Sequence, residues 1–222
     1  MVDFRISPNY GPEKQETGQI DDLIDVFEDR MRGWILEPAR ILGCVDSRFA
    51  LPSVLIQSVY FESIAAYLKG DDSGARVKGK TRSAEFFQYG VIDVLKRDDI
   101  PLEAVKTLAA FLYREVRCRL FHEGVAGTGF FTKVGMGAAF VLEFPMKPDG
   151  TFDSSKPCNS VVVDPGELWV AIEKHLSRYL VRLRDPDENE LRTSFERTYR
   201  RLVAMDEPPM TVSWHPDTLP RS

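Results

Sequence analysis

The chain has 222 residues, which is enough for one sizeable domain or two small ones. With 43% hydrophobic and 28% charged residues it has the composition of an ordinary soluble globular protein. The formal net charge of −5 excludes a globally basic nucleic-acid binder, so any contact with RNA needs a local cluster of Lys and Arg. Three widely spaced cysteines argue against a disulfide framework and favour the reducing cytoplasm.

The first half of the chain predicts a flexible leader followed by helices. Residues 1–19 are polar and rich in Pro and Gly, without a secretory signal. A helical pattern begins at Ile20, and Pro38 inside it predicts a kink or break near Glu37. A second helix is expected over residues 51–68. The side chains expected to face its core are Val54, Leu55, Val59, Ile64, Ala65 and Leu68.

A glycine-rich loop is expected over residues 69–82, between the second and third helices. Its five basic residues are Lys69, Arg76, Lys78, Lys80 and Arg82. A third helix should cover residues 83–96, and a fourth should begin near Leu102 and end near Gly124. The apolar stripe predicted for this fourth helix is Val105, Leu108, Leu112, Val116 and Leu120, with Ala109 beside it.

The pattern changes after Gly124. Residues 125–163 combine glycines with short β-branched runs and predict an insertion with a small β-hairpin. The glycines and Lys133 make the stretch 124–144 a poor membrane span, and no membrane is expected as a partner. Two more helices should follow, and residues 206–222 form a proline-rich tail. The expected fold is therefore mainly α, a single domain over 20–205 in which antiparallel helices form a bundle with a small irregular or β-hairpin insertion late in the chain.

The segment Tyr113–Gly124 carries the strongest indication of chemistry. It places Arg117 and His122 near the end of an amphipathic helix, with four residues between them. An arginine can hold phosphate oxygens, and a histidine can transfer a proton near neutral pH. Five residues of an ideal helix turn through ~500°, so these side chains would point about 140° apart. Either the helix is distorted at its end, or two chains complete one site across a symmetric dimer.

The run Arg117-Cys-Arg-Leu-Phe-His122 resembles the signature of the HEPN superfamily, all-α domains that often act as ribonucleases. Their motif is an Arg and a His separated by four to six residues on a bundle helix. The resemblance implies a metal-independent ribonuclease without a cofactor, which forms homodimers and serves in toxin–antitoxin or phage-defence systems beside an antitoxin or defence partner. One departure is Cys118, because active members usually carry Asn, Asp or His after the arginine. The alternative is a non-catalytic helical module that binds RNA, a nucleotide or a protein partner.

Several neighbouring residues are candidates for supporting roles, each with an alternative. Tyr113 and Cys118 lie within the motif segment, and Glu62 lies in the middle of an otherwise apolar helix, where it can orient Arg117 or His122 or remain half-exposed. Cys118 and His122 have the spacing of metal ligands, but no compact partner motif accompanies them and no metal is expected.

Basic residues outside the motif are candidates for RNA contacts. Arg114 and Arg119 flank Arg117 and either extend a phosphate-binding surface or pair with Glu115 and Glu123 as surface charges. The basic loop 69–82, through Arg76, Lys78, Lys80 and Arg82, either follows an RNA backbone or is a solvated loop.

Overall fold

The computed structural model describes residues 5–71, 74, 76–77, 80–97, 100–150, 153, 156 and 158–203. The expectation of a mainly helical fold with a small β insertion late in the chain is confirmed. Its α-helices are α1 (Pro12–Glu16), α2 (Ile20–Arg30), α3 (Glu37–Val45), α4 (Ala50–Lys69), α5 (Ser83–Leu95), α6 (Leu102–Leu112), α7 (Phe121–Glu123), α8 (Pro165–Arg184) and α9 (Asn189–Leu202). Segments η1 (Met31–Leu36) and η3 (Tyr113–Leu120) are π-helical, and η2 (Ser47–Phe49) is a short 3₁₀ turn.

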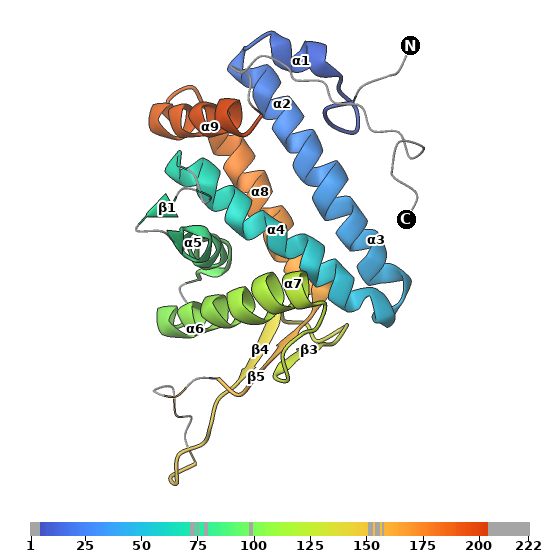
Figure 1. Ribbon diagram of the computed structural model, residues 1–222, viewed down its shortest axis with the longest axis vertical. Helices are drawn as coiled ribbons and strands as arrows, with labels where there is room; N and C mark the ends of the chain where they lie inside the picture. The colour runs from blue at the N-terminus through green and yellow to red at the C-terminus, as the bar shows by residue number, and fades with distance from the viewer. Residues whose placement is uncertain are drawn as a thin grey trace, which may run out of the picture.

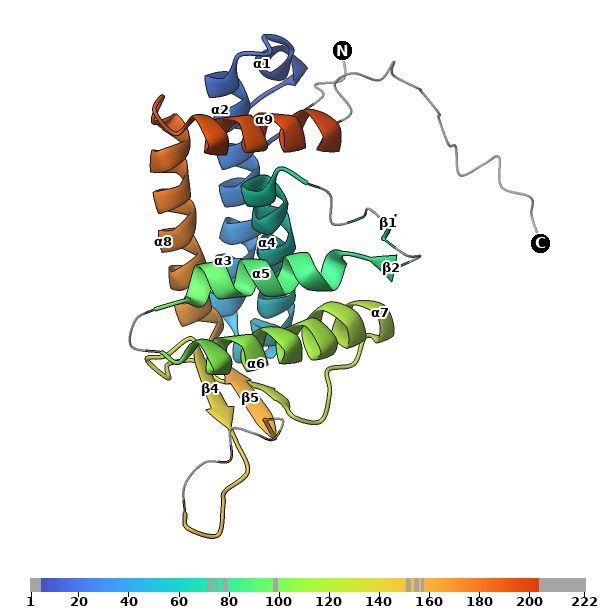
Figure 2. The same ribbon diagram turned by 90° about the vertical axis from the view of Figure 1, so that its left-hand side faces the viewer.

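Helix α4 is the centre of the fold and packs against α3, α5, α8 and α9. In Figures 1 and 2, α2, α3, α4 and α8 run along the long axis of the molecule, whereas α5, α6 and α9 lie across it. The bundle therefore departs from the expected antiparallel arrangement in these three crossing helices. The crossing of α5 over α4 depends on Gly90, because a Cβ there would collide with the backbone carbonyl of Phe61. This close approach brings the start of α5 beside the motif segment.

The first long helix is irregular where Pro38 enters it, although it does not end there. The π-helical segment η1 comes immediately before the proline, and α3 continues to Val45. Proline lacks an N–H and its ring presses on the carbonyl of the preceding turn, so a widened turn lets the helix continue past it. The side chains of α4 that were expected to face the core do so, except that of Val59, which is 44% exposed.

Residues 5–19 differ from the expected flexible leader, because they pack against α2. The hydroxyl of buried Ser7 donates to Asp29 Oδ2 at 2.6 Å, and both the backbone and side-chain nitrogens of Asn9 donate to the same carboxylate. Burial raises the pKa of Asp29. The hydrogen bonds from Ser7 and Asn9 lower it by more, so the pKa lies below its usual value. Short α1 then leads into α2. The proline-rich tail 206–222 lies outside the described residues.

The late insertion is a mixed three-stranded sheet in place of the expected hairpin. Its strands are β3 (Phe130–Thr132), β4 (Phe140–Glu143) and β5 (Ser160–Val163), in the order β3-β5-β4. Strand β5 pairs antiparallel with β4, as a hairpin would, and parallel with β3. Its β-branched residues make it the buried central strand, with Val161 and Val163 fully covered. Figure 2 shows the sheet beneath α6, away from the crossing of α5 over α4.

A smaller two-stranded ladder occupies part of the loop 69–82. Strand β1 (Arg76–Val77) pairs antiparallel with β2 (Lys80–Thr81). Among the described residues one stretch, Ser47–Lys69, is long and apolar enough to cross a membrane by length and composition. Just over half of its most apolar window is buried inside the protein, as for a core helix.

Candidate functional site

The catalytic and supporting residues predicted from the sequence line a single cavity of about 270 Å³. We call it the motif cavity. Helix α4 contributes Glu62, the start of α5 contributes Ser83, and η3 with α7 contributes the motif side chains. Its lining residues are Glu62, Gly74, Ser83, Tyr113, Arg117, Cys118 and His122. One chain therefore brings together Arg117, His122, Glu62, Cys118 and Tyr113.

The π-helical segment η3 explains how Arg117 and His122 reach the same cavity. A π turn bonds residue i to residue i+5, so residues five apart lie close to one face of the helix. Segment η3 ends at Leu120 and α7 ends at Gly124, which adopts the left-handed conformation with a φ of 70°. Of the two arrangements left open by the sequence, the distorted helix is the one that this chain adopts. A second chain is not needed to bring the two motif residues together.

Glu62 holds the Arg117 side chain from the opposite wall. Arg117 Nε donates to Glu62 Oε2 at 3.1 Å, and both side chains are half-buried, with 29% and 19% of their surface exposed. Within the described part of the chain, the two terminal nitrogens of Arg117 make no hydrogen bond. A guanidinium held through Nε keeps its terminal nitrogens free for the paired contacts that an anion such as phosphate accepts.

Phe121 lies between the two motif side chains and contacts both. The Arg117 guanidinium carbon is 4.9 Å from the centre of the Phe121 ring, and the His122 ring meets the same ring edge-on at 5.2 Å. His122 is exposed, and its ring nitrogens have no hydrogen-bond partner in the described residues. Its nitrogens are therefore accessible for proton transfer, a condition that a general base must meet.

Tyr113 and Cys118 form the polar floor of the motif cavity. The Tyr113 ring packs edge-on against Phe87 at 5.5 Å, which fixes its position. Burial raises the pKa of the Tyr113 hydroxyl, a hydrogen bond with Ser83 lowers it, and one with Cys118 raises it, for a net increase. A tyrosine is protonated at neutral pH even without such an increase, so the Tyr113 hydroxyl can act as a hydrogen-bond donor.

Arg114 and Arg119 do not line the motif cavity and instead bind a buried carboxylate. Glu115 is only 5% exposed and forms ion pairs with Arg114 and with Arg119, the latter at 3.2 Å. Arg119 also lies 3.6 Å from Glu123. These contacts match the alternative in which the two arginines pair with neighbouring acids. Their expected role as an RNA-binding surface therefore has little support from their contacts.

The described part of the basic loop is also engaged in ion pairs. Arg82 binds Asp71 and Glu85, and Lys69 binds Glu85 at 2.8 Å. Hydrogen bonds from Arg82 and Lys69 lower the pKa of Glu85 to about 2. The side chains of Arg76, Lys78 and Lys80 lie outside the described residues. Of the expected RNA-binding residues in this loop, Arg82 thus has its charge balanced within the protein.

A second cavity of about 300 Å³, which we call the adjoining cavity, shares two lining residues with the motif cavity. Its lining residues are Ser58, Val59, Glu62, Ser63, Ala66, Arg117, Phe121 and Leu202. The shared residues are Glu62 and Arg117, so their ion pair separates the two cavities. Sequence reasoning missed this cavity because α9 contributes Leu202 from more than 80 positions away.

A hydrogen-bonded chain around His175, which is buried except at Asp93, was also not predicted. Tyr60 Oη lies 2.8 Å from His175 Nδ1, and His175 Nε2 lies 2.9 Å from Asp93 Oδ2. Tyr60 is fully buried and His175 is 7% exposed. These three residues come from α4, α8 and α5, and they tie the central helix to its two neighbours. They do not line the motif cavity.

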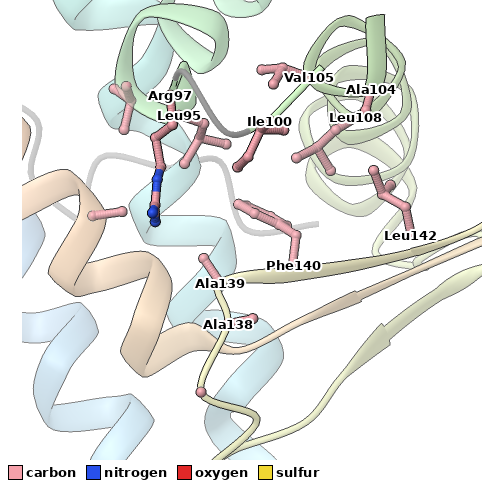
Figure 3. Close-up of a pocket in the computed structure, with 13 residues that line it drawn as sticks. Leu95, Arg97, Ile100, Ala104, Val105, Leu108, Ala138, Ala139, Phe140 and Leu142 are labelled. Atoms are coloured by element: carbon pink, nitrogen blue, oxygen red, sulfur yellow. The ribbon is translucent and has the colours of Figure 1, made fainter. Parts of the chain in front are cut away.

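A third cavity, of about 280 Å³, is lined mostly by apolar residues (Figure 3). It lies where the end of α5 and helix α6 meet β4, and Phe140 and Leu142 project into it from the strand. Among the described residues that line it, Arg97 is the charged one. These described residues do not combine a base, a cation and a carboxylate as those of the motif cavity do.

Within the described ranges, no three His, Cys, Asp or Glu side chains are grouped as a metal site requires. Comparisons of the chain with protein-family models, curated proteins and solved structures found no match.

Proposed function

We propose that the protein is a metal-independent endoribonuclease similar to the HEPN ribonucleases, with Arg117 and His122 as its catalytic pair. The observation that carries the proposal is the motif cavity, which holds both residues together with Glu62, Tyr113 and Cys118 on one chain. A histidine with accessible nitrogens, a cation and a carboxylate that fixes the cation are what phosphodiester cleavage without a metal requires.

In the proposed reaction, His122 removes the proton from a ribose 2′-OH. The 2′ oxygen attacks the adjacent phosphorus, the bond from phosphorus to the 5′ oxygen breaks, and a 2′,3′-cyclic phosphate forms. The departing 5′ oxygen takes a proton from solvent, to which His122 is exposed. The terminal nitrogens of Arg117 hold the phosphate oxygens as negative charge builds on them.

Glu62 and Tyr113 are proposed as positioning and hydrogen-bonding groups for this reaction. Glu62 binds Arg117 Nε at 3.1 Å and so restricts the guanidinium, whose terminal nitrogens are left to hold a phosphate. Tyr113 lines the same cavity, and its hydroxyl can donate to a phosphate oxygen. Cys118 takes the place of a more polar residue in the family motif and supports Tyr113 through its hydrogen bond.

A second candidate is a non-catalytic module that binds RNA, a nucleotide or a protein partner. It is favoured by Cys118, which stands where active members of the family usually carry Asn, Asp or His. The proposed homodimer and the proposed antitoxin or defence partner rest on the family resemblance. One chain supplies both motif residues to the cavity, so the cavity itself does not call for a second chain.

The proposal is tested by incubating the purified protein with mixed cellular RNA in EDTA, beside His122→Ala and Arg117→Gln variants. The matched control is Arg48→Gln, because Arg48 is 83% exposed and lines neither cavity. We expect wild type and the control to cleave and both motif variants to be inactive while remaining folded. No cleavage by wild type, or equal cleavage by all four proteins, would favour the binding module.

A further inference from the structure

The adjoining cavity presents an apolar slot beside the proposed catalytic pair. Three large apolar side chains line it and remain exposed to solvent: Phe121 (58%), Leu202 (54%) and Val59 (44%). Exposure of one such side chain is common, whereas three around one cavity indicate a surface that binds something. They come from α7, α9 and α4, so the slot is assembled by the tertiary fold.

The position of the slot identifies the kind of ligand that would fill it. Its wall of Glu62 and Arg117 is also the wall of the motif cavity, so a group in the slot lies next to a phosphate held by Arg117. In a nucleic acid, the flat apolar surfaces nearest to a phosphate are the faces of the nucleobases, which are joined to it through the ribose. Bases bind single-strand-binding proteins by stacking on aromatic rings, and every base has a flat face that can do so.

Phe121 has the properties of such a stacking ring. It is the aromatic residue of the slot and the most exposed of the three apolar side chains. Arg117 lies against it at 4.9 Å, which favours an electron-rich aromatic ligand close to the cation. On α4, Val59 and Ala66 provide a small apolar surface, and the Ser63 hydroxyl has no hydrogen bond among the described contacts.

We propose that the adjoining cavity binds an unpaired nucleobase next to the scissile phosphate, with Phe121 as the stacking residue and Leu202 as part of the slot. This inference rests on the proposed ribonuclease function and narrows its substrate class to single-stranded RNA. A base in a duplex is stacked and paired with its neighbours, so it is not available to Phe121. Duplex RNA of the same sequence is therefore a poor substrate.

The test measures binding separately from cleavage. The probe is a uniformly 2′-O-methylated single-stranded RNA, which cannot undergo attack by its 2′ oxygen, and its affinity is followed by fluorescence anisotropy. Phe121→Leu removes the flat ring and keeps an apolar side chain, Phe121→Trp keeps the ring, and Leu202→Ser changes a slot residue on another helix. Phe131→Leu is the matched control, since Phe131 is 53% exposed and lies on β3, outside both cavities.

We expect Phe121→Leu to weaken binding about 5- to 150-fold, the range that corresponds to the loss of one base–aromatic stack. Leu202→Ser should weaken it less, and Phe121→Trp and Phe131→Leu should bind as wild type. The salt dependence of binding should be the same for wild type and Phe121→Leu, because stacking releases no counterions. A reduced salt dependence would mean that the variant had displaced Arg117, and would overturn the stacking role.

The outcomes separate this inference from the proposed function. Wild type that cleaves RNA while Phe121→Leu binds and cleaves equally well would overturn the base site and leave the ribonuclease standing. Binding that depends on Phe121 without any cleavage would support the base site and reject the catalytic role. If Phe121→Leu differed from wild type in the mass measured by light scattering and not in RNA affinity, the slot would be a protein–protein contact and the inference would be overturned.

Discussion

The two histidines that the structure describes have opposite environments. His175 is buried, and each of its ring nitrogens has a partner, Tyr60 at 2.8 Å and Asp93 at 2.9 Å. His122 is exposed at the end of a distorted helix, and in the described structure its ring nitrogens have none. A histidine whose nitrogens are both engaged connects helices, whereas one with accessible nitrogens can exchange a proton with a substrate.

The same contrast extends to the residues around each histidine. Around His175, both ring nitrogens and the Tyr60 hydroxyl are hydrogen-bonded, and desolvation raises the pKa of Tyr60 well above its usual value. Around His122, Arg117 lines both the motif cavity and the adjoining cavity, and Phe121 lines the adjoining cavity. We therefore propose a structural role for the His175 region and a catalytic role for the His122 region, and substitutions in each can separate these roles.

The largest effect is expected from His122→Ala, which removes the proposed general base. Positioned acid–base groups contribute about 100- to 10,000-fold to rate, so the cleavage rate should fall by this factor. The melting temperature should stay that of wild type, because His122 is exposed. Single-turnover cleavage and a thermal melt of the same preparation give both quantities. A much lower melting temperature for the variant would show that His122, like His175, stabilises the fold.

His175→Ala should have the reverse profile. It leaves the Tyr60 hydroxyl buried without its partner and opens a cavity between α4 and α8, so we expect a loss of about 3 kcal/mol in the free energy of unfolding. At temperatures where the variant is folded, its cleavage rate should be within about threefold of wild type. Urea unfolding measures the loss, and Asp93→Asn, which keeps an acceptor at a partly exposed position, should lose less. Cleavage lost from a folded His175→Ala protein would contradict the division of roles.

The sequence allowed the motif and the helices to be predicted because both are encoded locally. Arg117 and His122 lie five residues apart, and the buried stripe of α6 and η3 follows helical spacing from Val105 to Leu120. Helical spacing also placed Val59 in the core, which was wrong, because spacing within one helix does not reveal where its neighbours end. Val59 lies at the adjoining cavity, to which α9 contributes Leu202.

Features built from distant segments could not be predicted in this way. Tyr60, Asp93 and His175 meet because α5 and α8 both pack on α4, with up to 115 positions between the partners. The parallel pairing of β3 with β5 likewise joins strands about thirty residues apart, whereas the antiparallel β4–β5 pair was within reach of a hairpin prediction. Side-chain placement in the motif cavity depended on the π-helical geometry of η3, which no residue pattern in the segment specified.

Glu62→Gln should have an intermediate effect on the His122 region. The amide can still accept from Arg117 Nε but lacks the charge that strengthens a contact now made at 3.1 Å. A loss of about 1.4 kcal/mol in the positioning of Arg117 corresponds to a tenfold lower rate. The test compares KM and kcat with those of Glu62→Ala, in which Arg117 loses its anchor and the rate should fall further. Equal rates for wild type and both variants would show that Glu62 has no part in placing Arg117.

The smallest effect is expected at Arg119. It is close to Arg117 in sequence, but its contacts are ion pairs with neighbouring acidic side chains. Arg119→Gln removes the ion pairs that partly exposed Arg119 makes with Glu115 and Glu123. Glu115 keeps its contact with Arg114, so the free energy of unfolding should fall by no more than about 1 kcal/mol. Cleavage should remain within about twofold of wild type, since Arg119 lines neither cavity. Affinity for the 2′-O-methylated RNA, measured against salt concentration, checks this expectation. A salt dependence lower by about one counterion would show that Arg119 leaves Glu115 to bind a phosphate, and the RNA surface would then continue around the helix beyond the two cavities.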